Sequence, residues 1–377
     1  MLRLLVAALL TAASALAADA PAPPLRVALT GQALIQHDLR AVAPEKFAAL
    51  AAALAGRDAV FTDLETVIDL GRGVKTRDSQ FFHAAPPAVL DCLREWHFNL
   101  LALSNNHSFD LAAEGVLATR EAVGARGFVY AGTGADLAAA AAPAFLPTPR
   151  GKVALVSFAS GKIAAGGAAT ADRAGVNEVR LDPATGEIDA TDAARVFAAL
   201  RLAAQSAAVV IAYQHDHYWE PDNRVTPAWK KKFAGACVEA GATVFVSHGA
   251  PLLHGLELHR GRPIFYGLGG LVFHTITAPG YYLPEVWESV IADAEFSGGQ
   301  LTALRLRAVA LNERGEGEPP SPRFYATRGA PTLATGPAAR AILARLAALS
   351  APLGTTFTFD GDTAVVTLPA SPPKTFP

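Results

Sequence analysis

The sequence predicts an α/β fold in which short buried strands alternate with helices and a sheet presents a polar site at one edge. Short apolar runs and helical patterns alternate through the first two thirds of the 377 residues. One run, residues 100–103, stops abruptly at Ser104-Asn105-Asn106-His107, as a buried strand does at its end. Several other apolar runs also end in polar residues, and open α/β sheets bind ligands at the carboxyl ends of their strands.

The predicted elements follow from apolar periodicity, from Pro at a helix start (Pro86-Pro87) and from Gly-containing turns such as Asp360-Gly361. In chain order they are a strand at 25–30, helix 43–55, strand 59–62, helix 86–95, strand 100–103, helix 112–126, strand 128–130, a hairpin over 144–158, a loop at 161–175, helix 193–206, strand 208–212, helix 227–240, strand 243–246, a hairpin over 256–268, strands 286–292 and 301–311, a loop at 315–322, helix 337–349 and a hairpin over 355–368.

Within the helix at 227–240, Lys230, Lys231 and Lys232 are expected to form a solvated face rather than a binding patch. We find no repeat and no composition break that requires a second domain. Residues 25–377 are therefore expected to form one domain, with residues 282–377 completing it.

Composition excludes some functions. Hydrophobic residues make up 51% of the chain and charged residues 18%, which is ample for a core. The net charge of −2 argues against nucleic acid or an anionic membrane surface as a partner, because both select basic patches. No segment after the N-terminal one reaches the length of about 18 apolar residues that a membrane span needs.

The first 17 residues resemble a secretory signal peptide. Arg3 precedes a short apolar stretch at 4–16, and Ala15-Leu16-Ala17 is an A-x-A cleavage site. Residues 18–24 then form a Pro-rich leader, so we expect a secreted or periplasmic protein. The alternative is a retained N-terminal anchor. No Cys lies near the cleavage site, which excludes lipidation there.

The two cysteines, Cys92 and Cys237, lie in helical stretches among apolar neighbours. A disulfide is chemically allowed in an exported protein, and two separately buried thiols are the alternative. Two thiols so far apart match no zinc-ligand spacing.

Five strand ends carry polar residues. They are Gly31-Gln32, Asp63-Leu64-Glu65, Asn105-Asn106-His107, His215-Asp216-His217 and His248. Carboxylate and imidazole are ligands of divalent transition metals, and alternation places the Asp63 and Glu65 side chains on one side of their strand. For a single His, a satisfied core histidine is the alternative, and the Asn side chains could simply cap the next helix. Three strands ending in His favour a shared metal site.

Four motifs carry a family resemblance: Asp63-Leu64-Glu65-Thr66, Ser104 to Asp110, Ala131-Gly132-Thr133-Gly134, and Gly255-Leu256-Glu257 through Gly261 to Gly269. With their order and spacing, residues 25–273 resemble the capsule synthesis protein CapA family, also called the poly-γ-glutamate synthesis family. The resemblance implies a calcineurin-like metallophosphatase fold, a four-layer αββα sandwich with mixed sheets.

The resemblance also implies site residues. Glu65, Asn106, His215 and His248 would bind a divalent metal, zinc or manganese. His107 would be a proton donor beside it, with an imidazole pKa near neutrality. Asp110 would either orient that imidazole or cap the next helix.

The sequence departs from the family at several of these positions. Gln32 stands where the family has Asp, and Asp63 where it has Asn, so we hypothesise that Asp63 is a ligand that offsets the missing carboxylate. Pro251 replaces a His, for which His254 is a possible substitute. Asn105 and His217 complete the pocket candidates.

Two functions remain open at this point. The first is a metal-dependent hydrolase acting on a phosphoester or a γ-glutamyl amide of a cell-envelope polymer or small substrate. The second is a non-catalytic accessory protein that works with capsule assembly proteins and keeps a degraded site. A sugar- or peptide-binding module without metal is a third, weaker alternative.

Overall fold

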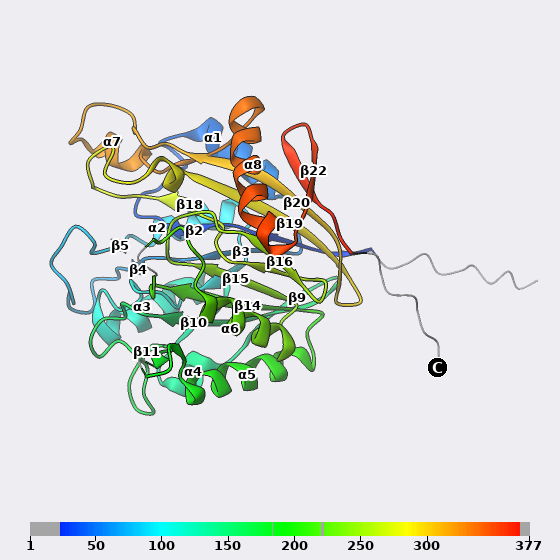
Figure 1. Cartoon of the computed structure of the whole chain (residues 1–377). Helices are drawn as coiled ribbons and strands as arrows, with labels where there is room; N and C mark the ends of the chain where they lie inside the picture. The colour runs from blue at the N-terminus through cyan, green and yellow to red at the C-terminus, as the bar shows by residue number, and fades with distance from the viewer. Residues whose placement is uncertain (1–22, 183, 220–221, 370–377) are drawn as a thin grey trace, which may run out of the picture.

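The computed structural model describes residues 23–182, 184–219 and 222–369. The predicted signal peptide and most of the leader therefore lie outside the described residues. Two large mixed sheets form the centre of the molecule, with helices against their outer faces (Figure 1).

The nine-stranded sheet has the order β22 (Phe357–Asp360), β23 (Thr363–Val366), β20 (Gln300–Leu311), β19 (Glu288–Ser297), β1 (Leu25–Leu29), β3 (Ala59–Asp63), β6 (Leu100–Ala102) and β7 (Val129–Ala131), with β21 (Pro331–Leu333) paired to β20. The six-stranded sheet has the order β16 (Leu256–His259), β17 (Arg262–Phe265), β15 (Val244–His248), β14 (Val209–Asp216), β10 (Gly151–Ser160) and β9 (Ala144–Thr148). In each sheet the central strands that lead to the site are parallel.

Alternation along each strand divides the core into three layers. In β1, Val27 and Leu29 face the other sheet and pack with Leu155 and Ile211, whereas Ala28 faces outward. On that outer side, α1 (Pro44–Leu54), α2 (Ala88–Glu95) and α3 (Ala112–Ala125) cover the nine-stranded sheet. The six-stranded sheet is covered by α5 (Ala190–Ala204) and α6 (Ala228–Glu239). The predicted four-layer αββα arrangement is thus confirmed.

The C-terminal helix α8 (Gly336–Ser350) packs its apolar side onto the core between the sheets. The remaining elements are small: β2 (Gln32–Leu34), β4 (Val67–Ile68), β5 (Ala84–Ala85), β8 (Thr133–Gly134), β11 (Gly175–Val176), β12 (Leu181–Asp182), β13 (Glu187–Ile188), β18 (Gly270–Phe273), α4 (Leu137–Ala141), α7 (Pro322–Thr327), and the 3₁₀ turns η1 (Pro284–Trp287) and η2 (Ala351–Leu353). No helix within the described ranges is both long and apolar enough to cross a membrane.

The main strands and helices agree with the sequence predictions, with two differences near the site. The strand predicted at 208–212 continues to Asp216 as β14, so His215 lies within the strand rather than after it. The short parallel pair of β2 and β18 was not predicted, because it joins segments far apart in the chain.

The expected solvated lysine face on α6 is wrong at one position. Lys231 and Lys232 are exposed, but Lys230 is only 4% exposed and pairs with the buried carboxylate of Asp216. The two cysteines are separate, buried thiols, so the disulfide alternative does not hold.

Candidate metal centre

Parallel strands from both sheets bring the predicted residues to one end of the molecule. Asp63 and Glu65 come from the end of β3, and Asn105 to His107 come from the turn after β6. His215 on β14 is in register with His248 on the neighbouring β15. Because parallel strands share one carboxyl edge, polar residues distant in sequence meet there.

His215 is at the centre of the cluster and is fully buried. Its Nε2 lies 2.9 Å from Oδ1 of Asn106 and 3.0 Å from Nε2 of His217. Oε1 of Glu65 lies 3.6 Å from the same nitrogen. Among the described residues, Glu65, His215 and His217 form a group whose ligand atoms are all within 4.8 Å of one another.

The contacts around these atoms leave two of them, His215 Nε2 and Asn106 Oδ1, as lone-pair atoms that face one another. Nδ1 of His215 faces the Asp63 carboxylate at 3.2 Å, which favours the proton on Nδ1 and leaves a lone pair on Nε2. Asn106 donates Nδ2–H to His107 Nε2 at 3.0 Å, so its oxygen points at His215. Lone pairs of nitrogen and oxygen that face one another repel unless a cation lies among them. This donor set of two imidazoles, one carboxylate and one amide oxygen fits a divalent transition metal.

Asp63 supports the cluster from behind. Its Oδ1 accepts a hydrogen bond of 3.0 Å from Nδ2 of Asn105. Its Oδ2 lies near Nδ1 of His215, whereas Asn106, His217 and Glu65 lie near Nε2 of the same ring. Asn105 also donates to the Leu64 carbonyl and accepts the His107 backbone N–H, which fixes the turn. The geometry therefore gives Asp63 an orienting position rather than the ligand position we hypothesised.

Three other predicted residues lie outside the ligand group. His248 has Nδ1 3.3 Å from the Tyr213 hydroxyl, while its buried Nε2 has no hydrogen-bond partner among the residues that the structure describes. Gln32 accepts the Gly249 backbone N–H through Oε1 at 2.9 Å. The structure does not make His254 a substitute ligand, because its two ring nitrogens face the carbonyl oxygens of Tyr266 and Asn223.

His107 and Asp110 form a dyad beside the cluster. Nδ1 of His107 donates to Oδ2 of Asp110 at 2.9 Å, and that oxygen also accepts the His83 backbone N–H. Arg77 binds the other carboxylate oxygen at 2.9 Å. The side chain of Asp110 does not cap α3, whose N-cap is Leu111 without a side-chain bond, so the capping alternative is wrong and the orienting one stands.

Burial dominates the acid–base behaviour of the site. It raises the pKa of Glu65 well above its usual range, and the nearby Asp63 and Asp110 carboxylates add to this. Burial also lowers the pKa of His107 and of His217 well below 6.5, so both rings are neutral near pH 7. The pKa of Asp110 rises to about 6 through burial, which the His83 N–H and Arg77 partly offset. Neutral imidazoles are the form that binds metal.

A pocket of about 360 Å³ opens onto the cluster. Its floor includes Glu65, Asn106, His107 and His217, and aromatic side chains together with two cations, Arg77 and Lys162, form its walls. We did not predict Arg77, Lys162 or Trp219, because loop residues without a motif give no signal in a single sequence.

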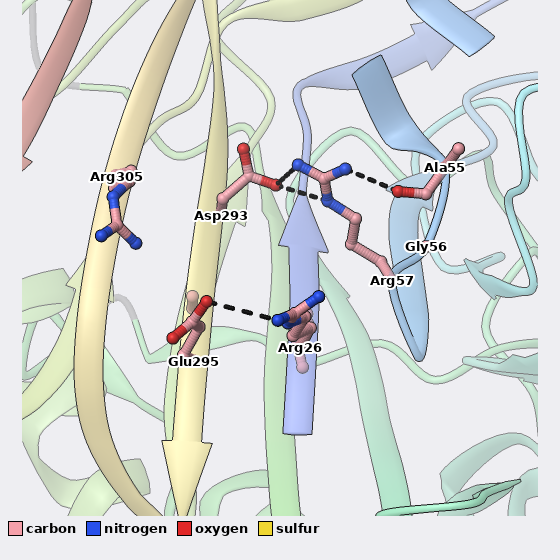
Figure 2. A pocket seen from close by; sticks show the side chains of 9 residues that line it. Arg26, Ala55, Gly56, Arg57, Asp293, Glu295 and Arg305 are labelled. Carbon is pink, nitrogen blue, oxygen red and sulfur yellow. Dashed lines mark hydrogen bonds and ion pairs between the residues drawn. The ribbon is translucent and has the colours of Figure 1, made fainter. Parts of the chain in front are cut away.

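A second pocket, of about 230 Å³, lies on the nine-stranded sheet near the end of α1 and is shown in Figure 2. Its charged side chains pair mainly with each other: Arg57 lies 2.9 Å from Asp293, and Arg26 lies 3.8 Å from Glu295. None of the predicted site residues lines it.

Comparison with known proteins places the chain in a family. A family model described as bacterial capsule synthesis protein PGA_cap matches residues 26–275. The chain belongs to this family. The match covers every predicted site residue, from Gln32 to His254.

Two relatives and one solved structure illustrate the similarity. A probable polyglutamine synthesis accessory protein of Mycobacterium tuberculosis is 29% identical over 57% of this chain and 55% of its own length. The capsule biosynthesis protein CapA of Bacillus anthracis is 27% identical over 52% of this chain and 45% of its own. A novel phosphatase of Mycoplasma pneumoniae shares 12% identity at a TM-score of 0.41, over 76% of this chain and 87% of its own.

Proposed function

We propose that this PGA_cap protein is an exported, metal-dependent hydrolase of capsule or cell-envelope polymer metabolism. Its substrate would be a phosphoester or a γ-glutamyl amide. The observation that carries the proposal is the convergence of Asn106 Oδ1, His217 Nε2 and Glu65 Oε1 on His215 Nε2, a donor set that suits a cation. Zinc or manganese suits imidazole and carboxylate ligands.

In this proposal Glu65, Asn106, His215 and His217 hold the metal, and Asp63 holds His215 in the required tautomer. A bound metal of this kind lowers the pKa of a water molecule and polarises the scissile group. His107 is neutral, and its Nε2 accepts the Asn106 Nδ2–H beside the pocket. Once substrate displaces that hydrogen bond, this nitrogen would take up a proton and pass it to the leaving group. The Asp110 carboxylate behind Nδ1 stabilises the imidazolium that forms.

The test is elemental analysis of protein purified without a His-tag, combined with assays on a chromogenic phosphodiester and on poly-γ-glutamate with added zinc or manganese. We expect bound metal and turnover of one substrate. His217→Asn should remove most of both. His97→Asn is the matched control, because His97 is exposed and has a positive φ that Asn accepts.

The alternative is an accessory protein of capsule polymer assembly whose site only binds. Gln32 at a position where the family has Asp, and Pro251 at a position where it has His, favour this alternative, as does the name of the Mycobacterium relative. No turnover of either substrate together with no bound metal would decide for it. Export has its own test: the mature protein recovered from the producing cell should begin at residue 18.

A further inference from the structure

Lys162 has a backbone conformation that is unusual for its residue type. β10 ends at Ser160, and the next two residues, Gly161 and Lys162, have φ values of 74° and 54°. Glycine adopts this left-handed region freely, but a lysine rarely does. Such conformations persist where the surrounding structure enforces them, and they cluster at functional sites.

This conformation places the lysine at the pocket. Its ammonium lies 4.2 Å from the centre of the Trp219 ring, and both side chains line the pocket that opens onto the metal cluster. Trp219 is itself fixed, because its Nε1–H donates to the Asp216 carbonyl at 3.1 Å and its ring lies 4.8 Å from that of His217. The lysine charge is therefore held next to a ligand of the cluster.

Arg77, the other cation of the pocket, is already engaged. It binds the Asp110 carboxylate and donates to the Asn106 carbonyl at 2.9 Å. Within the described part of the chain, no carboxylate pairs with Lys162. An ammonium that has no carboxylate partner among the described residues, and that lies at a pocket beside the His215 cluster, is suited to bind an anion brought in by the substrate.

We propose that Lys162 binds an oxyanion of the substrate, a phosphate or a carboxylate adjacent to the scissile bond. This inference rests on the proposed function for the position of that bond, and it assigns substrate selection to a residue outside the metal ligands and the His107–Asp110 dyad. Phosphate and carboxylate both present negatively charged oxygen atoms that a lysine ammonium can bind. Titration with a phosphate probe and with a carboxylate probe shows which of the two Lys162 binds.

The experiment is calorimetric titration of the zinc-loaded full chain with inorganic phosphate and, separately, with γ-glutamylglutamate. Lys162→Asn removes the charge and keeps a residue that accepts positive φ. We expect it to weaken binding of one probe about tenfold, and Lys162→Arg to stay within about threefold of the wild type. Lys231→Asn is the control, because Lys231 is exposed on α6 and does not line the pocket, and it should leave affinity unchanged.

The loss in Lys162→Asn should shrink at high salt, since a partly exposed ion pair is screened. Equal affinity of Lys162→Asn and the wild type for both probes would overturn the inference, as would failure of the wild type to bind either one. If the wild type turns over substrate but both probes bind as tightly to Lys162→Asn as to the wild type, the inference is rejected and the proposed function stands. If probe binding depends on Lys162 but the wild type shows no turnover, the inference stands and the proposed hydrolase function is rejected. Zinc content and thermal unfolding of each variant verify that it is folded and loaded.

Discussion

Oδ2 of Asp63 lies 3.2 Å from Nδ1 of His215, on the opposite side of the ring from Asn106 and His217. Both side chains are fully buried. A carboxylate in this position favours the proton on Nδ1, which leaves the Nε2 lone pair free for a metal. The carboxylate at position 63 thus contacts the cluster through a histidine.

Asp63→Asn tests that role. We expect zinc affinity to fall by about ten- to a hundredfold, the usual effect of losing an orienting partner, while the site still binds zinc. Competition with a chromogenic chelator measures the change, and Asp78→Asn, at an exposed loop position, is the control. Complete loss of binding would instead make Asp63 a direct ligand, and unchanged affinity would deny it any part in the site.

Lys230→Met should strongly destabilise the fold. Nζ of Lys230 lies 2.6 Å from the Asp216 carboxylate, and both side chains are buried. Removing one partner leaves an uncompensated buried charge, which costs about 3–5 kcal/mol of unfolding free energy. Urea denaturation measures this cost.

The matched control for that pair is Lys231→Met on the exposed side of α6, which should change stability by less than about 0.5 kcal/mol. The double variant Asp216→Asn/Lys230→Met should recover part of the loss, because it removes both charges. A small effect of Lys230→Met alone would show that water reaches the pair.

Stability should fall as the pH is lowered from about 6.5. Burial lowers the pKa of His83 to about 3, with a further contribution from the neighbouring His107. Between pH 6.5 and pH 3, His83 is protonated in the unfolded chain and neutral in the folded protein. The free energy of unfolding therefore drops by as much as about 1.4 kcal/mol per pH unit for this group. Denaturation at a series of pH values gives the slope.

Near pH 5, His83→Asn should reduce the slope of unfolding free energy against pH by the amount that corresponds to about one proton. The variant His97→Asn, at an exposed position, should leave the slope unchanged. If His83→Asn and the wild type lose stability in parallel between pH 6.5 and 4, the buried neutral state assigned to His83 is wrong.

Gln32→Asp should add a second metal. In the present chain Oε1 of Gln32 accepts the Gly249 N–H, while Nε2 of His248, the residue before Gly249, is buried and meets no hydrogen-bond partner in the described ranges. A carboxylate at position 32 would supply the anionic ligand that the resemblance implies, next to Asp63 and His248. Metal content should rise from about one to about two ions per chain, as in two-metal hydrolases. Gln300→Asp, on an exposed hairpin, should not change it.

The sequence predicts the main strands because they are continuous apolar runs, and it predicts the site because polar residues stop those runs at one edge. It does not distinguish a residue that binds from one that orients. Asp63 and Glu65 are two positions apart on one strand, and only the approach of His215 from the other sheet separates their roles.

The incorrect expectations have a common physical cause, which is contact between distant segments. Lys230 stands in a run of three lysines that is typical of a solvated face, but the end of β14 provides a buried carboxylate for it. His254 is two residues from a buried strand, where backbone carbonyls rather than a metal face its nitrogens. Arg77 and Lys162 come from turns without any periodic pattern.

The pairing of β1 with β19 has a consequence for biogenesis. Leu29 lies opposite Ala292, so the strand made first has an unprotected edge until the last quarter of the polypeptide has been synthesised. Such non-local pairing slows folding, and exposed edges invite aggregation. A nascent or truncated product ending before Glu288 should therefore depend on a chaperone, and protease resistance should appear only once β19 has left the ribosome.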